Sequence, residues 1–460
     1  MIDTSNRDNI NIKDKKVTIL GLGLSGTSAA KLANHMGAIV FGSDLSMNED
    51  VLSNSWELMN VDHIATETGI NSDRIFDSEL WVVSPGISKN SEIIINGQNH
   101  NIPIVSEVEF ASWFTSSKII AITGSNGKTT TSYILAKMCK THKVNGRMAG
   151  NMGIPFSECV LNELLNPDKK TIYILEISSF QMEFIEHFCP YIALYTNITE
   201  DHLDRHGSME EYFDMKMKMI QNIKPENYIV YNSKDSRLVS AFKYNKFYRN
   251  VYCFNSDDSF YKISNNSVIN KTNNIEFKLS NFKLPGEHNI SNFISAAICA
   301  TLLGIESKHI INVFSTFKSI EHRLEYVISI NDVDYINDSK ATNINSVIVA
   351  IKTYSKPIIL ILGGYNKGSD FRLLLPHIKS SCVRMIISYG EAGGQINTVL
   401  GDAVRSLQVT DLSSAVNQAQ ILAKPGEIVL FSPGCASFDQ FKNFEERGNF
   451  FKSIIKVKKL

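Results

Sequence analysis

Short apolar runs alternate with longer segments of helical periodicity along nearly the whole chain. This alternation predicts an α/β fold with mostly parallel sheets. Three blocks separate, and we expect one domain in each, at residues 1–106, 107–320 and 321–460. We expect the first and third domains to be Rossmann-like, and the central one to be a parallel-sheet domain of the P-loop ATPase type.

The apolar runs also predict individual strands. They are expected at residues 17–20, 39–43, 80–84, 118–123, 173–176, 192–196, 335–337, 358–362, 385–388 and 428–431. The polar segment 260–279 predicts a β-hairpin. A helix is expected to begin near Ser208, because Ser208 and Glu211 form an S-x-x-E capping box.

A glycine fingerprint, Gly21-Leu-Gly23-Leu-Ser-Gly26, follows the first predicted strand. Such a turn offers a helix N-terminus to a diphosphate. The second apolar run ends at Asp44, where dinucleotide-binding units carry an acid near a ribose. Taken alone, this stretch favours an NAD(P)-dependent dehydrogenase.

A second glycine loop, Gly124-Ser-Asn-Gly127-Lys128-Thr129, lies between a predicted strand and a predicted helix. Glycines at a helix N-terminus let backbone N–H groups face a phosphate chain. In P-loops the lysine reaches the outer phosphates and the next hydroxyl joins a Mg²⁺ shell. The match to the Walker A pattern is incomplete, because Ile122 stands at its first glycine position. A plain glycine turn followed by a lysine is the alternative.

Further along the chain, Glu176, His202 and Lys216 are candidates for a metal site. Glu176 ends a predicted strand, where open α/β sheets bind ligands, and His202 follows the next strand. Lys216 lies on the capped helix, and a buried neutral lysine serves as a base or a modified ligand. The structural alternatives are that Glu176 is a solvated acid, that His202 caps a helix and that Lys216 is a surface lysine.

Composition and charge narrow the classes of protein. The 460 residues are 43% hydrophobic and 20% charged, with a formal net charge of −1, so nothing favours a nucleic-acid partner. Seven scattered cysteines without a C-x-x-C pair are typical of reduced thiols. The polar N-terminus does not resemble a signal peptide, and no apolar run reaches membrane-spanning length. We therefore expect a cytoplasmic protein that neither binds nucleic acid nor inserts into a membrane.

Together the motifs resemble the ATP-dependent Mur ligases of bacterial cell-wall synthesis, and most of all the members that add D-glutamate. The resemblance covers nearly the whole chain and all three blocks. Its motifs, in the family's order, are GSNGKTT, GNMGIP, LEISSFQ, NITEDHLDRH, GEHNISN, HRLEYV with INDSKATN, and FSPGCASFDQFKNFEERG. The last two are the most diagnostic of the D-glutamate type.

The resemblance implies an ATP- and Mg²⁺-dependent amide ligase. ATP would phosphorylate the free carboxylate of UDP-N-acetylmuramoyl-L-alanine, and the amine of D-glutamate would attack the acyl phosphate. The tetrahedral intermediate would then collapse to the amide, ADP and phosphate. The implied partners are these two small-molecule substrates, and we expect a monomer.

Site residues carry over by motif position. The resemblance implies catalytic roles for Lys128, Glu176, His202 and Lys216. It implies a metal site of Thr129, Glu176, His202 and Lys216, the last as a carbamate whose oxygen is an anionic ligand. The implied ATP-binding residues are Gly124, Ser125, Asn126, Gly127, Lys128, Thr129, Thr130, Asn289, Asn292, Arg323 and Asp338.

The implied substrate-binding residues fall into three groups. Those for the UDP part are Leu24, Ser25, Asp44, Ser46 and Ser84; that for the acceptor is Asn151; those for D-glutamate are Lys340, Thr342, Lys367, Ser437 and Phe444. Phe444 also fits a core position, since Phe441 precedes it at helical spacing. The chain departs from the family at Asn366, where an acid usually precedes the lysine, and at the bulky Tyr365.

Other classes compete with this interpretation. An NAD(P)-dependent dehydrogenase would use the first glycine stretch and leave the second idle. A non-catalytic NTP switch or motor would explain the second stretch and little else. A ligase that adds another amino acid would lack the C-terminal motif, and one that polyglutamylates folate would lack the first block.

Overall fold

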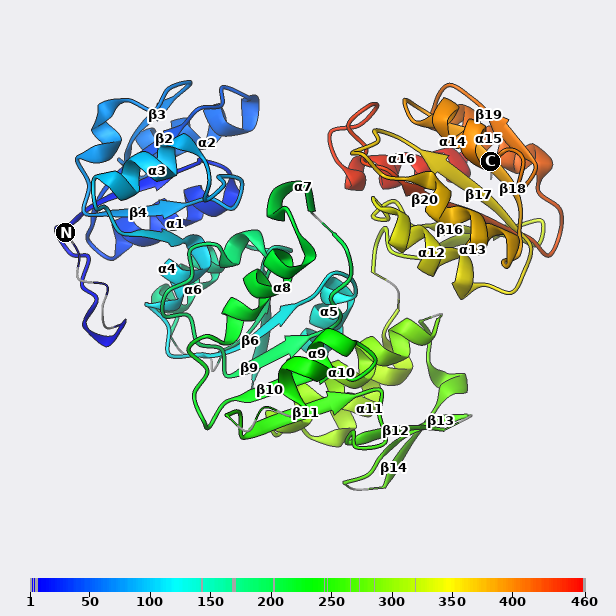
Figure 1. Ribbon diagram of the computed structural model, residues 1–460, viewed down its shortest axis with the longest axis horizontal. Coiled ribbons are helices and arrows are strands. Elements are labelled where there is room, and N and C mark those ends of the chain that lie inside the picture. Colours follow the sequence, from blue (N-terminus) through cyan, green and yellow to red (C-terminus); the bar gives the residue numbers. More distant parts are fainter. Residues whose placement is uncertain are drawn as a thin grey trace. The chain divides into compact units, whose positions relative to one another are not determined.

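The computed structural model describes residues 2, 4, 7–141, 144–167, 171–201, 203–243, 245, 247–264, 266–272, 274–284, 286–318 and 320–457. The chain divides into two compact units, Met1–Leu279 with Ser291–Phe314, and Ser280–Ile290 with Ser315–Leu460. The first unit contains two parallel sheets and a small antiparallel one, and the second contains a mixed sheet (Figure 1). Within the described part, no helix is both long and apolar enough to cross a bilayer.

The N-terminal sheet has five parallel strands in the order β3-β2-β1-β4-β5. Its strands are β1 (Lys16–Leu20), β2 (Ile39–Asp44), β3 (Ala65–Thr68), β4 (Leu80–Val83) and β5 (Ile104–Ser106). Its helices are α1 (Leu24–His35), α2 (Glu49–Asn60) and α3 (Glu92–Asn99). The strand order reverses at β1 and β4, so the first glycine turn lies at a topological switch point, where open sheets bind ligands.

The central sheet has six parallel strands in the order β11-β10-β9-β6-β8-β7. Its strands are β6 (Lys118–Thr123), β7 (Asn145–Gly150), β8 (Thr171–Glu176), β9 (Ile192–Tyr195), β10 (Tyr228–Asn232) and β11 (Asn250–Phe254). The helices of this region are α4 (Glu107–Ser112), α5 (Lys128–Cys139), α6 (Phe156–Leu165), α7 (Leu203–His206), α8 (Met209–Met217) and α9 (Ser236–Phe242). Because β6 lies between β8 and β9, the loops after these three strands meet at one edge.

The segment expected to be a hairpin is a three-stranded antiparallel sheet, so that prediction was wrong. Its strands are β12 (Tyr261–Ser264), β13 (Ser267–Asn270) and β14 (Ile275–Lys278). Two asparagine-rich turns divide the segment, and Asn274 in the second adopts a φ of 55°, which asparagine tolerates better than most residues. Two helices follow, α10 (Glu287–Leu302) and α11 (Ser307–Thr316).

The sheet of the second unit has six strands in the order β15-β16-β20-β17-β18-β19. Only β15 is antiparallel to its neighbour. The strands are β15 (Glu325–Ile330), β16 (Val333–Asn337), β17 (Ile358–Gly363), β18 (Val383–Tyr389), β19 (Ser406–Gln408) and β20 (Ile428–Gly434). The helices are α12 (Ile344–Thr353), α13 (Leu375–Lys379), α14 (Gly393–Leu400), α15 (Leu412–Leu422) and α16 (Phe444–Val457).

The expected strands all occur, with ends shifted by no more than a few residues. The predicted cap is also confirmed, since the Ser208 hydroxyl accepts a hydrogen bond from the Glu211 N–H at 3.1 Å. The expected α/β class is confirmed as well. The boundaries expected at residues 106 and 320 stay a prediction.

Helix α4, which connects the two parallel sheets of the first unit, carries two buried carboxylates. Glu107 accepts a hydrogen bond from the Ser157 N–H at the start of α6, and burial raises the pKa of Glu107 to about 7. Glu109 is fully buried and accepts hydrogen bonds from the Trp113 indole and from the N–H groups of Glu186, His187 and Phe188. These bonds fix the connecting helix against the central sheet.

We predict that Glu109→Gln lowers the free energy of unfolding of the first unit by about 2–3 kcal/mol, because three backbone N–H donors, of which that of Phe188 is buried, lose a charged acceptor. Thermal and urea unfolding of the full chain measure the effect. Exposed Glu226 is the control, and Glu226→Gln should leave the transition unchanged. Equal stability of Glu109→Gln and wild type would contradict this role.

Candidate active site

The loop between β6 and α5 is shaped by two glycines with positive φ. Gly124 has a φ of 143°, and a Cβ there would lie 2.0 Å from the Thr196 hydroxyl oxygen. Gly127 has a φ of 84° and is the N-cap of α5. A side chain at Gly124 would therefore both strain the backbone and collide with the neighbouring strand end. The loop places the N-terminus of α5 at the switch point of the central sheet.

The segment after β9 holds this loop in place. The Ser125 N–H donates to the Asn197 carbonyl oxygen at 2.8 Å, and the Asn126 N–H donates to the Asn197 side-chain oxygen at 3.0 Å. The Ser125 hydroxyl donates to the Thr199 carbonyl oxygen at 2.7 Å. Asn197 was not among the predicted site residues, although it is the first residue of the NITEDHLDRH motif.

Two lysines converge on one carbonyl of the loop. The Lys128 ammonium donates to the Gly124 and Ser125 carbonyl oxygens at 2.7 and 2.9 Å. The Lys216 amine donates to the same Gly124 oxygen at 3.1 Å and lies 4.5 Å from the centre of the Tyr212 ring. Only 1% of Lys216 is exposed. Burial, and then the nearby charge of Lys128, hold the pKa of Lys216 well below its ordinary value.

Glu176 ends β8 beside this loop with one carboxylate oxygen unused. Its Oε1 accepts a hydrogen bond from the Asn151 side-chain amide at 3.1 Å, whereas its Oε2 is buried and has no hydrogen-bond partner among the described residues. The Asn151 N–H donates to the Glu176 carbonyl oxygen at 2.8 Å. This bond holds Asn151, the residue predicted to bind the acceptor substrate, against the end of β8. A buried carboxylate oxygen without a donor fits a cation.

The predicted metal ligands are partly brought together. Thr129 is buried in the first turn of α5, Glu176 is the last residue of β8, and Lys216 lies on α8. His202 lies outside the described residues. Across the described ranges, no group of three or more His, Cys, Asp and Glu side chains is arranged to hold a metal ion. The Thr129 hydroxyl, the free Glu176 oxygen and the buried Lys216 amine nevertheless fit Mg²⁺ if the amine becomes an oxygen ligand.

Two of the predicted ATP-binding residues, Asn289 and Asn292, lie at the start of α10. Asn292 is buried, and its side-chain oxygen would lie 2.5 Å from a Cβ at Gly127. This places Asn292 directly against the helix cap of the glycine loop. Asn289, one turn earlier on α10, is also buried.

The first glycine turn forms a second cradle on the N-terminal sheet. Gly21 has a φ of 89°, and a Cβ at Gly26 would lie 1.8 Å from the Gly21 carbonyl oxygen. The Ser84 hydroxyl donates to that oxygen at 2.9 Å. Asp44 accepts hydrogen bonds from the N–H groups of Leu22 and Ser46 at 2.6 and 2.7 Å. The structure therefore gathers the predicted Asp44, Ser46 and Ser84 around this turn. Exposed Leu24 and half-buried Ser25 open the following helix.

In the second unit, Asp338 follows β16 and is buried. Its oxygens accept hydrogen bonds from the Ser432 hydroxyl at 2.7 Å and the Leu324 N–H at 3.2 Å. Burial raises the pKa of Asp338 to about 7, although these donors and the charge of Arg323 act against the rise. A buried carboxyl group whose pKa is raised to near 7 is typical of a functional site.

The predicted D-glutamate residues occupy three loop ends of the same sheet. The Lys340 ammonium lies 4.3 Å from the centre of the Phe444 ring, so Phe444 is not simply a core residue. The exposed Lys367 lies 4.9 Å from the Phe438 ring centre. Thr342 is exposed and Ser437 is buried.

The departure at Asn366 has a local explanation. Its side chain accepts from the Ser369 N–H at 2.7 Å and donates to the Gln395 side chain at 2.9 Å. Asn366 therefore closes its own turn and leaves Lys367 at the surface. Tyr365 pairs with Ala436 through two backbone hydrogen bonds, so its bulk is accommodated on the outer side of that bridge.

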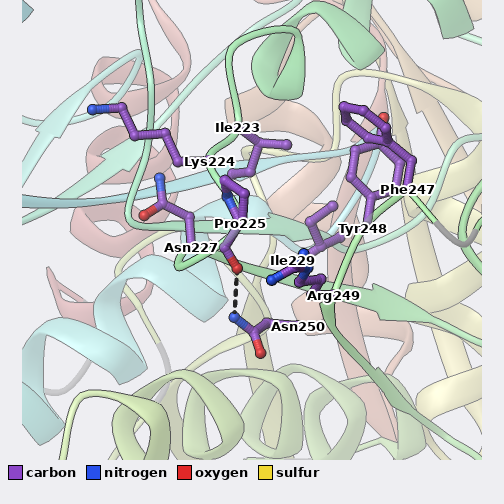
Figure 2. A pocket seen from close by; sticks show the side chains of 9 residues that line it. All are labelled: Ile223, Lys224, Pro225, Asn227, Ile229, Phe247, Tyr248, Arg249 and Asn250. Carbon is purple, nitrogen blue, oxygen red and sulfur yellow. Dashed lines mark hydrogen bonds between the residues drawn. The ribbon is translucent and has the colours of Figure 1, made fainter.

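Two cavities of the first unit lie away from these residues. One of about 350 Å³ lies at the start of β10 and β11 (Figure 2) and is lined by Ile223, Lys224, Pro225, Asn227, Ile229, Phe247, Tyr248, Arg249 and Asn250. There the Phe247 and Tyr248 rings meet edge to face with their centres 5.3 Å apart, and the Asn250 amide donates to the Pro225 carbonyl oxygen at 2.9 Å. Another, of about 550 Å³, lies between α8 and α9. Neither of these two cavities is lined by a predicted site residue.

Fold and site together define a class of α/β proteins in which a glycine loop on a central parallel sheet is combined with two further Rossmann-like sheets. The sequence matches the Mur ligase middle domain over residues 122–300 and the Mur ligase glutamate ligase domain over residues 322–435. The chain belongs to the Mur ligase family.

Individual relatives match over nearly their full length. The chain is 36% identical to the UDP-N-acetylmuramoylalanine–D-glutamate ligase of Chloroherpeton thalassium, covering 96% of this chain and 98% of that one. It is 37% identical to the protein of the same name from Christiangramia forsetii, with 96% and 99% covered. Among solved structures, the UDP-N-acetylmuramate–alanine ligase of Thermotoga maritima has the same fold, with a TM-score of 0.61 at 17% identity over 96% of this chain and 100% of that chain.

We predict that stability depends on pH through Asp338. Because its folded-state pKa lies above the ordinary value, the proton stabilises the folded state below about pH 4, and this contribution is lost as the pH rises to about 7. The melting temperature of wild type should therefore fall relative to that of Asp338→Asn between pH 5 and pH 8. Exposed Asp402 provides the control, Asp402→Asn. A pH-independent difference between wild type and Asp338→Asn would contradict the shift.

Proposed function

We propose that this protein is an ATP-dependent ligase that joins D-glutamate to UDP-N-acetylmuramoyl-L-alanine in peptidoglycan precursor synthesis. The relatives that match over their full length carry the name of this activity. The observation that carries the proposal is the glycine loop after β6, on whose Gly124 carbonyl both Lys128 and the buried Lys216 converge. A monomeric state and a cytoplasmic location belong to the same proposal.

ATP is proposed to bind the loop from Gly124 to Thr130. The N-terminus of α5 presents backbone N–H groups to an anion, and the macrodipole adds positive potential. Lys128 is turned onto its own loop, and it would exchange these carbonyl oxygens for phosphate oxygens. Neutralising charge at the transferring phosphoryl group is the main requirement of this chemistry. The proposal also assigns Asn289, Asn292, Arg323 and Asp338 to ATP.

Mg²⁺ is proposed to be held by Thr129, Glu176, His202 and Lys216. When bound, it would supply Lewis-acid neutralisation of phosphate and acyl oxygens. The unpartnered Oε2 of Glu176 supports its part in the set. Asn151 would fix the orientation of Glu176 by occupying its other oxygen.

Lys216 is proposed to act as a carbamate. The depressed pKa leaves the amine neutral, which is the form that attacks CO₂. The nitrogen forms a bond to carbon, one proton leaves to solvent, and the product is an anionic carboxylate on the lysine. The new negative charge would offset the positive charge of Lys128 beside it and give the metal an oxygen ligand.

The two substrates are proposed to use the two remaining sheets. The diphosphate of the UDP-sugar would face the helix N-terminus after the first glycine turn, with Leu24 and Ser25 beside it and Asp44, Ser46 and Ser84 around the uridine part. D-Glutamate would use Lys340, Thr342, Lys367, Ser437 and Phe444. A dianionic amino acid requires cations and N–H or O–H donors, which this set contains.

The test is phosphate release from ATP by the purified protein. We expect release only when UDP-N-acetylmuramoyl-L-alanine and D-glutamate are present together, because the acyl phosphate forms on one and is consumed by the other. Lys128→Ala is the negative control. Release with L-lysine or meso-diaminopimelate in place of D-glutamate would contradict the substrate, and near-normal turnover by Lys128→Ala would remove the loop from the mechanism.

A second test addresses the carbamate. We predict that Lys216→Ala lowers kcat by about 10²-fold or more, because the anionic ligand is lost, and that short carboxylates such as formate restore part of the activity. Lys218→Ala, which changes a half-buried lysine just after the same helix, should keep most of the activity without carboxylate. Full activity of Lys216→Ala would contradict the carbamate.

A further inference from the structure

Arg447 on α16 is a completely buried cation whose acceptors are all neutral. Its guanidinium donates to the Ser339 hydroxyl and carbonyl oxygens at 3.1 and 2.7 Å, and to the Cys435 and Ala436 carbonyl oxygens at 3.1 and 2.9 Å. Its exposed fraction is 0%. No carboxylate in the described part of the chain forms an ion pair with it.

A buried charge without an opposite charge is costly, and proteins usually pair it or leave it exposed. The same unit contains the ordinary arrangement, because Arg384 forms a two-pronged ion pair with Glu427. Arg447 is therefore an exception within its own sheet. Such an uncompensated charge leaves a positive potential at the ends of β16 and β20.

The bonds of Arg447 also set the direction of two loops. They draw the carbonyl of Ser339, just after β16, and those of Cys435 and Ala436, just after β20, towards the guanidinium. In a trans peptide the N–H points away from the carbonyl, so the Ser437 N–H faces away from Arg447. This N–H donates to no other described residue, although Ser437 is only 3% exposed. The neighbouring Ala436 carbonyl is held from a second side by the Tyr365 N–H.

We propose that Arg447 is a positioning residue that adapts this unit to a dianionic amino acid. It aims the Ser437 N–H at a substrate carboxylate, and its buried charge attracts that carboxylate without touching it. Through Ser339 it also fixes the loop that carries Lys340. This inference rests on the proposed function, because it requires D-glutamate to bind at these loops.

The experiment compares Arg447→Lys and Arg447→Met with wild type in the phosphate-release assay, varying D-glutamate and ATP separately. Arg447→Lys keeps the positive charge but loses the planar guanidinium with its several N–H donors, and Arg447→Met loses both the charge and the donors. We expect KM for D-glutamate to rise about 10-fold in Arg447→Lys and further in Arg447→Met, with KM for ATP within about twofold. The matched control is Arg384→Lys, which removes the guanidinium of an arginine that is ion-paired with Glu427. This variant should change neither KM.

Ser339→Ala keeps the experiment decisive if the arginine variants do not fold. It removes one neutral acceptor of Arg447, and KM for D-glutamate should rise by a few-fold with a melting temperature close to that of wild type. An unchanged KM for D-glutamate in folded Arg447→Lys or Ser339→Ala would overturn the inference. So would an equal rise in both KM values, which indicates general structural damage. If wild type fails to turn over D-glutamate, the proposed function fails instead.

Discussion

The site depends on how closely the loop after β6 approaches the end of β9. The backbone of Gly124 leaves no space for a side chain, because the Thr196 hydroxyl occupies the position of a Cβ. This contact lets Asn197 and Thr199 hold the loop through its N–H and hydroxyl groups. It also places the Gly124 carbonyl where two lysines from different helices reach it. The arrangement of charge around the site follows from this one approach.

Buried charged groups of both signs recur near the strand ends. Lys216 is buried beside another lysine, and Arg447 is surrounded by neutral oxygens. Glu176 keeps one oxygen unused, and burial raises the pKa of Asp338. Each of these groups would be costly in a protein that bound nothing there. Their positions at the carboxyl ends of parallel strands fit anionic substrates and a cation.

Much of the fold could be predicted from the sequence because buried parallel strands are continuous apolar runs. The strand β6 was predicted with its observed ends, and β17 and β20 with only slightly short ends. Strand β7 was missed, because its sequence NGRMAG has no apolar run and forms by pairing along β8. The three-stranded β12–β14 sheet was taken for a hairpin, since polar turn residues occur at two places and the chain alone does not show how many turns form.

The candidate site was predictable where chemistry lies within a continuous motif. The glycine loop, Glu176 and Lys216 were found in this way, and the structure brings them together. Asn197 was missed because its role is to bond to a loop about seventy residues earlier in the chain. Arg447 was missed for the same reason, since no carboxylate of the described residues forms an ion pair with it, which only the three-dimensional arrangement reveals.

The central claim is that the chain has two cradles for two different ligands, ATP at Gly124 and the UDP-sugar at Gly26. The most direct measurement is calorimetric titration of Gly124→Ala and Gly26→Ala in the full chain with Mg-ATP and with UDP-N-acetylmuramoyl-L-alanine. A side chain at either glycine closes one cradle only, since a Cβ would collide with Thr196 in one and with the Gly21 carbonyl in the other. We expect Gly124→Ala to lose ATP and keep the UDP-sugar, and Gly26→Ala to do the reverse. Loss of ATP binding in Gly26→Ala with retention in Gly124→Ala would contradict the claim.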